Sequence, residues 1–262
     1  MGKWQDKAVW ITGGGTGLGK FMAMEFARGG AQVAVSGRRE DRLQGAVEAL
    51  EALGARAVAV PCDVTDEGQL QSAVETVVDT FGRMDVAVAN AGFSVAGRVE
   101  KLTFEDWRRQ FDVNVCGAAM TCAKAIPALR QTQGRVALVG SVAAMVHFAK
   151  AGPYQASKAA IHALGNTLAL ELARDGISVT TLHPGFVDSE IGQVNNAGVY
   201  DPEQKDIRPP QLMWETEPAA RRMVEAIYRR KREYVFTGHG RFGWFMARHF
   251  PSVTHAVASR LR

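Results

Sequence analysis

Tyr154 and Lys158 stand four residues apart in the segment YQASK, so a helix would place both side chains on one face. A tyrosine hydroxyl has an ordinary pKa of about 10, which is too high for efficient proton exchange near neutral pH. A neighbouring ammonium group favours the phenolate, so we expect Lys158 to lower the pKa of Tyr154. Such a tyrosine could donate a proton to a carbonyl oxygen or accept one from an alcohol. The spacing is also common on ordinary amphipathic helices, so it needs support from other residues.

Two further polar residues could act with this pair. Ser141 follows the apolar run GRVALVG (134–140), and ligands of open α/β sheets bind at the carboxyl ends of strands. Its hydroxyl could hold a substrate oxygen for Tyr154, although serines at strand ends also form turns. Asn114 lies in the helical segment FDVNVCG, where a buried amide usually bridges backbone groups. We treat Asn114, Ser141, Tyr154 and Lys158 as a candidate acid–base centre.

The segment TGGGTGLGK (12–20) could receive the phosphates of two kinds of ligand. Read from Gly14, it is a nucleotide-triphosphate loop except that Phe21 replaces the Ser or Thr that holds Mg²⁺. Read from Thr12, it is a glycine-rich turn between a strand and a helix, where helix N–H groups can meet a pyrophosphate. The usual G-x-G-x-x-G pattern is matched in no register, so the context has to decide.

Short runs rich in Val and Ala alternate with longer segments of helical composition. Such runs, apolar nearly throughout, are typical of strands that are buried on both faces of a parallel sheet. They are 7–12, 31–36, 55–60, 84–90, 134–140 and 177–183, and a seventh strand is expected at 233–238. The helical segments are 17–28, 39–53, 67–81, 104–129 and 153–174. We therefore predict a single-domain, Rossmann-type, doubly wound α/β fold over residues 1–262.

Local signals mark where three of the helices begin. Thr103 and Asp106 have the spacing of a capping box, and Pro153 fits the first turn of the helix that carries Tyr154. Thr216 is the expected cap of a further helix that precedes the seventh strand.

Composition excludes several classes of protein. A chain of 262 residues with 47% hydrophobic content can bury one sizeable core. No apolar run approaches the roughly 18 residues of a membrane span, and we expect no signal peptide. Cys62, Cys116 and Cys122 lack metal-ligand spacing, and the histidines form no H-E-x-x-H pattern or Cys/His cluster. We therefore expect a cytoplasmic protein with reduced thiols and no metal.

The glycine turn and six further sites, in this order and spacing, resemble the classical short-chain dehydrogenase/reductase family across nearly the whole chain. The matching pieces are Asp63, NAG (90–92), Asn114, Ser141, Tyr154 with Lys158, and PGFVDS (184–189). The resemblance implies a dinucleotide ligand, so the nucleotide-triphosphate interpretation is set aside. It also implies that Asn114 holds a water for a proton relay, that Lys158 bonds the ribose, and that the protein is a homodimer or homotetramer.

The second strand indicates which cofactor is preferred. Gly37 stands where family members that prefer NAD carry an acid, about 20 residues after the glycines, and Arg38 and Arg39 follow. A guanidinium group suits a 2′-phosphate, so we expect NADPH or NADP⁺ in preference to NAD(H). The expected cofactor contacts are Gly13, Gly15, Thr16, Gly17, Leu18, Gly19, Ser36, Arg38, Arg39, Asp63, Val64, Asn90, Ala91, Gly92, Tyr154, Lys158, Pro184, Gly185, Val187 and Ser189.

Residues 186–216 are rich in Gly, Asn and Pro without a clear period, which favours a substrate loop or lid. The expected substrate contacts are Phe93, Met145, Phe148, Phe186 and Met213, although such residues also pack lids. We expect an NADP(H)-dependent oxidoreductase that interconverts a ketone or aldehyde and an alcohol on an apolar substrate, lipid-like ones included. Two alternatives stay open, a 3-oxoacyl-thioester reductase and a non-catalytic NADPH-binding sensor or scaffold.

The basic charge lies at the C-terminus. The chain has a net charge of +4, but residues 221–262 hold ten Lys and Arg residues against two acidic ones. The charge therefore does not indicate nucleic-acid binding by the main body. Residues 239–262 form an aromatic, arginine-rich extension that Pro251 should interrupt. We expect it to be a subunit contact or lid, with a peripheral membrane anchor as the alternative.

Overall fold

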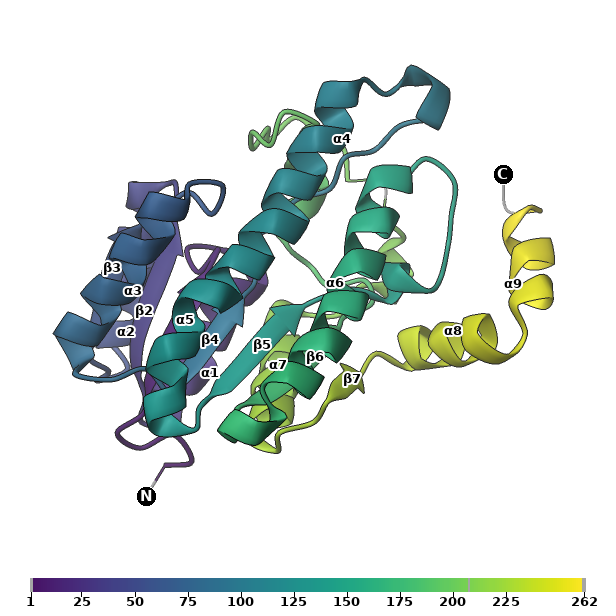
Figure 1. Ribbon diagram of the computed structural model, residues 1–262. Coiled ribbons are helices and arrows are strands. Elements are labelled where there is room, and N and C mark those ends of the chain that lie inside the picture. The colour runs from purple at the N-terminus through teal and green to yellow at the C-terminus, as the bar shows by residue number, and fades with distance from the viewer. Residues whose placement is uncertain (1, 207, 261–262) are drawn as a thin grey trace.

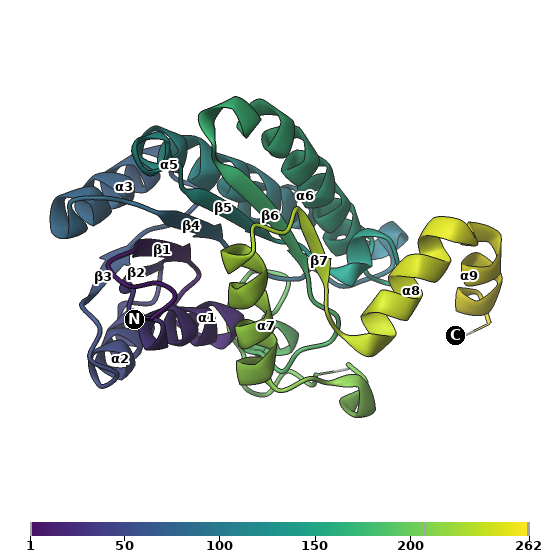
Figure 2. The ribbon, with the colours of Figure 1, turned by 90° about the horizontal axis from the view of Figure 1, so that it is seen from below.

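Seven strands form one parallel sheet in the order β3-β2-β1-β4-β5-β6-β7 (Figures 1 and 2). The computed structural model describes residues 2–206 and 208–260. The strands are β1 (Ala8–Thr12), β2 (Gln32–Gly37), β3 (Ala57–Pro61), β4 (Val86–Ala89), β5 (Arg135–Val139), β6 (Ser178–His183) and β7 (Glu233–Val235). The strand order reverses between β1 and β4, and open α/β sheets bind ligands at such a switch point. The predicted doubly wound sheet is confirmed.

Helices cover both faces of the sheet, with α1, α2 and α7 on one face and α3, α5 and α6 on the other (Figure 2). Their bounds are α1 (Gly17–Arg28), α2 (Glu40–Glu51), α3 (Glu67–Phe81), α4 (Phe104–Phe111), α5 (Ala118–Thr132), α6 (Gly152–Glu171) and α7 (Thr216–Tyr228). Adjacent residues of β1 therefore join separate clusters, Val9 and Ile11 on one face and Trp10 on the other. Burial on both faces explains why the strand sequences are apolar throughout.

Two predicted helix starts are confirmed. Thr103 and Asp106 form a capping box at the start of α4, and Pro153 lies in the first turn of α6. The predicted helix 104–129 is wrong in one respect, because a π-helical turn, Asp112–Gly117, separates α4 from α5.

The predicted cap of α7 is also wrong. Glu215 is the N-cap, and Thr216 is the first helical residue. The Thr216 hydroxyl instead donates to the carbonyl of Asp188, far away in the sequence. The local pattern misplaced the cap by one residue because a tertiary hydrogen bond uses the hydroxyl.

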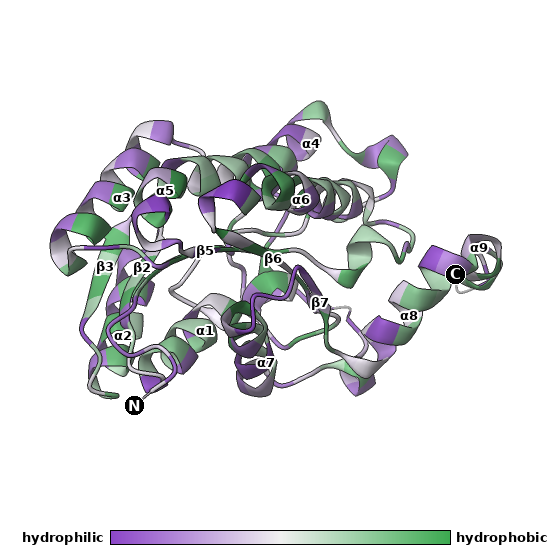
Figure 3. Cartoon of the chain, turned by 60° about the horizontal axis from the view of Figure 1, so that its bottom comes forward, coloured by the Kyte–Doolittle hydropathy of each residue, from purple (hydrophilic) through white to green (hydrophobic). Residues whose placement is uncertain are grey.

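Two more helices, α8 (Gly238–His249) and α9 (Pro251–Ala258), extend away from the sheet beyond β7 (Figures 1 and 2). Pro251 begins α9, so the predicted interruption of this segment is confirmed. Trp244 of α8 is buried, whereas Phe242 and Phe245 are exposed, and both helices carry hydrophobic residues (Figure 3). Within residues 2–206 and 208–260, no helix is both long and apolar enough to span a bilayer.

Candidate active site

The predicted site residues gather at the carboxyl ends of four neighbouring strands. The glycine turn follows β1, Asn90 follows β4, Ser141 follows β5, and the segment 184–189 follows β6. Tyr154 approaches from the first turns of α6. Parallel strands bring these segments to one edge of the sheet, which is where this class of fold binds its ligands.

The glycine turn is fixed against the segment after β4. The Asn90 side-chain amide donates to the carbonyls of Thr12 and Gly13, each at 3.0 Å. The Thr12 hydroxyl accepts from the backbone N–H groups of Asn90 and Ala91 at 3.2 and 3.3 Å. Gly13 has φ +64°, and a Cβ there would lie 2.9 Å from both Asn90 and Ala91. The turn therefore requires glycine at this position.

The start of α1 has the features of an anion site. Thr16 is the N-cap, but its side chain caps no N–H group among the described residues, so first-turn donors are free for a ligand. Gly17 has φ +49° and faces Ser189, to which a Cβ would come within 3.4 Å. A cleft of about 310 Å³ adjoins this turn, lined by Gly15, Thr16, Gly17, Lys20, Asp41, Arg42, Gly45 and Glu190. These features fit a dinucleotide pyrophosphate.

A larger hollow, of about 460 Å³, lies between β3 and α3. It contains none of the predicted site residues, so its size does not make it the candidate site. The chemistry of the lining residues favours the cleft beside the glycine turn.

The four residues of the acid–base centre lie together. Asn114, Ser141 and Lys158 are buried, and Tyr154 is half-buried. The Lys158 ammonium lies 5.7 Å from the centroid of the Tyr154 ring and donates to the Val139 carbonyl at 2.8 Å. The Ser141 side chain is close enough to the Tyr154 phenol to affect its pKa by hydrogen bonding. The arrangement can pass a proton to an oxygen atom held between Ser141 and Tyr154.

Asn114 lies in the π-helical turn between α4 and α5. Its Oδ1 accepts from the Phe93 backbone N–H at 3.1 Å, and its Nδ2 donates to the Phe93 carbonyl at 3.0 Å. Nδ2 also lies 3.2 Å from the Ser157 hydroxyl, beside Tyr154 on α6. Asn114 thus ties the loop after β4 to α6. π-Helical turns are frequent at functional sites, but the helical period of the sequence gave no sign of this one.

The expected lowering of the Tyr154 pKa is not found. Burial raises the pKa of Tyr154, and the Ser141 hydrogen bond and the positive charge of Arg208 offset only part of that effect. Lys158 is not among the groups that lower it, and burial lowers the pKa of the Lys158 ammonium itself to about 8. The Tyr154 phenol therefore carries its proton at neutral pH and can act as a donor.

The two arginines expected to hold a 2′-phosphate have partners in residues 186–216. Arg38 donates to the Gly198 carbonyl at 3.0 Å. Arg39 pairs with Glu190 at 2.7 Å and lies 3.4 Å from the Thr16 hydroxyl. Both arginines are exposed, and the two partners of Arg39, Thr16 and Glu190, line the cleft at the start of α1. Sequence reasoning missed Glu190 because nothing near it in the chain points to Arg39.

Two other predicted cofactor contacts bond to protein groups. The Ser36 hydroxyl is fully buried and accepts from the Trp10 indole at 2.8 Å, so it faces the interior. The predicted cofactor contact of Ser36 stays a prediction, and its hydroxyl is engaged by Trp10. Asp63 accepts from the backbone N–H and the hydroxyl of Thr65 at 3.0 and 2.8 Å, which closes a turn after β3.

Residues 186–216, which we call the lid, cross the edge of the sheet that carries the site. Arg208 donates to the carbonyls of Val187 and Ser189, each at 2.8 Å, and pairs with Asp206 at 2.6 Å. Its side chain is 16% exposed. Arg208 is a functional candidate that sequence reasoning missed, since these partners meet only in the folded lid.

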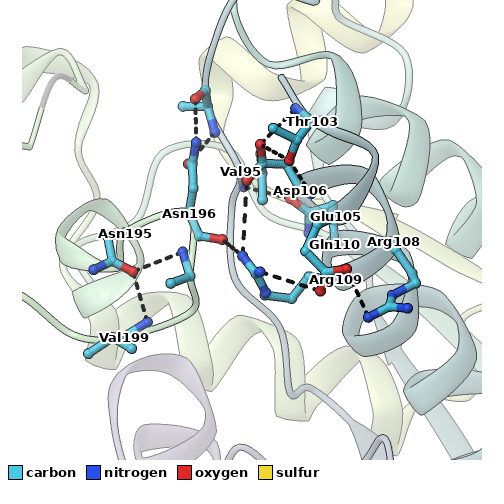
Figure 4. Close-up of polar contacts among 12 residues, drawn as sticks. Val95, Thr103, Glu105, Asp106, Arg108, Arg109, Gln110, Asn195, Asn196 and Val199 are labelled. Carbon is cyan, nitrogen blue, oxygen red and sulfur yellow. Dashed lines mark hydrogen bonds and ion pairs between the residues drawn. The ribbon is translucent and has the colours of Figure 1, made fainter. Parts of the chain in front are cut away.

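A second set of contacts joins the lid to α4 and to the loop that precedes it (Figure 4). The Asn196 side chain accepts from the Ala96 N–H and donates to the Ala96 carbonyl, both at 3.0 Å. Arg109 of α4 donates to the Asn196 carbonyl at 2.6 Å. The lid is thereby tied to the segment after β4 and to α4.

The predicted substrate residues differ in exposure. Phe93 is buried beside Asn114, and Phe148 is 45% exposed. Phe186 is half-buried and stacks on His239, with ring centroids 5.8 Å apart. Met145 and Met213 are also half-buried. Four of the five side chains are therefore buried or half-buried, whereas that of Phe148 is exposed to solvent.

The expectation that the histidines are scattered is wrong for two of them. His162 of α6 and His183 of β6 lie with Glu233 of β7, and their ligand atoms are within 4.8 Å of one another. No sequence motif announced this cluster, because its members come from three elements.

Residues 7–204 match the family model described as short chain dehydrogenase. An uncharacterized oxidoreductase from Staphylococcus epidermidis is 32% identical over 199 residues, which cover 76% of this chain and 85% of that protein. A 3beta-hydroxysteroid dehydrogenase from Mediterraneibacter gnavus is 30% identical over 200 residues, 76% of this chain and 72% of that one.

Solved structures agree with the family match. A short chain dehydrogenase from Burkholderia cenocepacia in complex with NADP has a TM-score of 0.78 and 30% identity, over 88% of this chain and 96% of that one. A short chain dehydrogenase/reductase from Burkholderia phymatum in complex with NAD has a TM-score of 0.72 and 27% identity, over 87% and 81%. The chain belongs to the short-chain dehydrogenase family of nicotinamide-dependent oxidoreductases.

Proposed function

We propose that this protein is an NADP(H)-dependent oxidoreductase that interconverts a ketone or aldehyde and an alcohol on an apolar substrate. The observation that carries the proposal is the position of Tyr154, with its proton retained, beside Ser141 and Lys158 at the edge of the sheet next to the glycine turn. A binding module has no need of this arrangement, which disfavours the sensor or scaffold alternative.

The side chains have separate tasks in the reaction. Bound nicotinamide would supply the hydride for the carbonyl carbon, or accept it from the alcohol. Ser141 holds the substrate oxygen, and Tyr154 gives its phenolic proton to that oxygen in reduction and takes it back in oxidation. Lys158 lies beside Tyr154, with its ammonium 5.7 Å from the centroid of the phenol ring, and would donate to the ribose hydroxyls of the cofactor. Asn114 positions the loop of Phe93 and α6 around them.

The residues present fit a phosphorylated dinucleotide. The uncapped start of α1 and Gly17 receive the pyrophosphate, and Asn90 fixes the turn that presents them. Arg38 and Arg39 directly follow β2, and Gly37 holds the position at which a carboxylate would favour NAD. A guanidinium group binds phosphate in a bidentate manner, which supports the NADP preference. The relative with bound NADP supports it too, although a similar relative binds NAD.

An apolar substrate is supported by the segments around the acid–base centre. Phe93, Met145 and Phe186 are largely withdrawn from solvent beside Asn114, Ser141 and the segment after β6. A relative is named 3beta-hydroxysteroid dehydrogenase, and that name supports an apolar alcohol or ketone as the substrate. We therefore place steroid and other alicyclic ketones first among the substrates to be tried, before 3-oxoacyl thioesters.

We further propose a homo-oligomeric, cytoplasmic protein whose extension α8–α9 contacts a second copy. Phe242, Phe245 and Phe250 are exposed along this extension, which supports a subunit contact. Two of the three free cysteines are buried, which supports a reducing compartment. Sedimentation of the full chain and of a chain that ends at residue 240 would show whether removal of α8–α9 produces a smaller assembly. Liposome flotation of the same proteins tests the peripheral membrane alternative.

The experiment that tests the activity measures oxidation of NADPH and NADH against steroid ketones, aliphatic ketones, aldehydes and 3-oxoacyl thioesters. We expect turnover with NADPH that depends on Tyr154. Tight NADPH binding without turnover of any compound would favour the sensor alternative, and faster turnover with NADH would contradict the cofactor preference.

A further inference from the structure

Three potential metal ligands meet behind the acid–base centre. His162 comes from α6, His183 ends β6, and Glu233 begins β7. Nε2 of each histidine lies 3.7 Å from Oε1 of Glu233. His183 is fully buried, and the side chains of His162 and Glu233 are each 22% exposed. The mechanism proposed above uses none of these three side chains.

The hydrogen bonding of His183 determines which ring nitrogen carries the proton. Its Nδ1 lies 3.1 Å from the Ser141 carbonyl oxygen, which can only accept, so Nδ1 is the protonated nitrogen. His183 is fully buried, and in a neutral ring that donates from Nδ1 the lone pair is on Nε2. That lone pair faces Glu233.

Two acceptors therefore face each other with no donor between them. Nε2 of His183 and Oε1 of Glu233 are both buried, and neither has a hydrogen-bond partner among the residues that the structure describes. Buried acceptors without partners are costly, and a carboxylate oxygen close to an imidazole lone pair adds repulsion. A bound cation would remove both costs, because each atom would become a ligand.

We propose that His162, His183 and Glu233 bind a divalent transition metal of the zinc class. Two imidazole nitrogens and one carboxylate oxygen are a zinc donor set, and a fourth position is left for another ligand. Ligand atoms on tetrahedral zinc lie roughly 3.4 Å apart, given bonds of about 2.1 Å. The separations from Glu233 to each histidine are 3.7 Å, and all three ligand atoms lie within 4.8 Å of one another, so side-chain rotations that draw them together would reach this value.

The surroundings of His183 are those of a metal ligand. Histidines that bind metals usually donate their other ring N–H to a carbonyl or carboxylate, as His183 does to Ser141. The metal would thus fix the ring that supports the Ser141 backbone. It would act as a structural link among α6, β6 and β7, one residue removed from the acid–base centre.

Trp244 of α8 covers the cluster. The centroid of its ring lies 4.4 Å from that of the His183 ring, at an interplanar angle of 38°. It lies 5.5 Å from the centroid of the His162 ring, at an interplanar angle of 80°. Trp244 is itself buried, so it shields the site from solvent. Glu233 and Trp244 lie beyond residue 204, where the match to the family model ends. The proposed site therefore depends on the C-terminal part of the chain.

Metal analysis of the full chain, without an affinity tag, tests the proposal directly. Protein stripped with a chelator is titrated with Zn²⁺ against a chromophoric competitor, and its melting temperature is recorded. We expect about one equivalent of zinc per chain and a rise in melting temperature of roughly 5–10 °C at a hundredfold excess over Kd. Co²⁺ in place of Zn²⁺ should give ligand-field absorption typical of a low-coordinate site. None of these readouts depends on turnover, so failure here is distinct from failure of the proposed activity.

Variants assign the site to these ligands. His162→Gln and Glu233→Gln should each abolish the zinc-dependent rise in melting temperature and the Co²⁺ absorption. His255→Gln, an exposed histidine on α9, is the matched control and should keep both. Because His183 is fully buried and its variant could fail to fold, the half-buried His162 carries the test. An absence of zinc binding by the wild type, or equal binding by His162→Gln, overturns the proposal.

Discussion

The acid–base centre and the lid above it are held by different kinds of contact. Asn114 and Lys158 are buried and bonded to backbone groups of Phe93 and Val139, which belong to the loops and strands of the core. The lid is held instead by side chains at the surface, such as the pair of Arg39 with Glu190. Exposed ion pairs contribute only about 0–1 kcal/mol each. The geometry for chemistry is therefore part of the core, whereas we expect the lid to open at a smaller cost in free energy.

The largest expected effect is on the catalytic rate and comes from a change in the acid–base centre. Tyr154→Phe removes the proton donor while keeping the ring, so kcat should fall by about 10²–10⁴-fold. The unfolding free energy should change by only about 1 kcal/mol, since the change removes at most the hydrogen bond with Ser141. Steady-state kinetics and urea unfolding measure the two quantities. Tyr228→Phe, on α7, is the control, and retention of full activity by Tyr154→Phe would show that another group supplies the proton.

The free energy of unfolding should also show the cost of burying the Lys158 ammonium in the acid–base centre. Its folded pKa of about 8 lies below the ordinary value of 10.5, so the unfolded chain binds more protons between these values. The unfolding free energy of the wild type should therefore gain a contribution as pH rises from 8 to 10.5, and Lys158→Met should lack it. At pH 7, Lys158→Met should be inactive but more stable by about 1–3 kcal/mol.

Urea unfolding of both proteins at pH 7 and pH 10 measures this difference, because other titrating groups are common to the two. A variant less stable than the wild type at pH 7 would mean that the hydrogen bond to Val139 outweighs the burial of the charge.

In the lid, Arg208→Gln should increase local opening without affecting the core. The change removes the pair with Asp206 and weakens the bonds to Val187 and Ser189. Cleavage of residues 186–216 by chymotrypsin should become roughly 5–10-fold faster, while the global unfolding free energy stays the same. Arg241→Gln, outside the lid, is the control. Equal cleavage rates would show that Arg208 is not a latch, and the distinction between centre and lid would weaken.

The smallest effect is expected where the lid meets the proposed phosphate site. The Glu190 carboxylate pairs with the Arg39 guanidinium at 2.7 Å and would compete with a 2′-phosphate for that group. Glu190→Gln should raise the affinity for NADPH by up to about 5-fold and leave that for NADH unchanged, as measured by titration calorimetry. Glu203→Gln serves as the control. If the affinities for both cofactors rose together, Glu190 would act on the pyrophosphate region and not on the 2′-phosphate.

Sequence alone determined the architecture and the order of the candidate site residues. The helices 17–28 and 67–81 have the predicted bounds, and the capping box of Thr103 and Asp106 formed as expected. These features depend on neighbours along the chain, through hydrophobic period and local hydrogen bonds. Even here Thr216 was misplaced, because Asp188 is not a neighbour in the sequence.

Tertiary structure decided the state and the partners of the site residues. The raised pKa of Tyr154 follows from burial, which no spacing of Tyr and Lys reveals. The π-helical turn at Asn114 and the bonds of Arg208 to Val187 and Ser189 arise from packing between distant segments. The cluster of His162, His183 and Glu233 draws on α6, β6 and β7. Charge, burial and ligation depend on which groups the folded chain brings within a few ångströms, and that information is not local in the sequence.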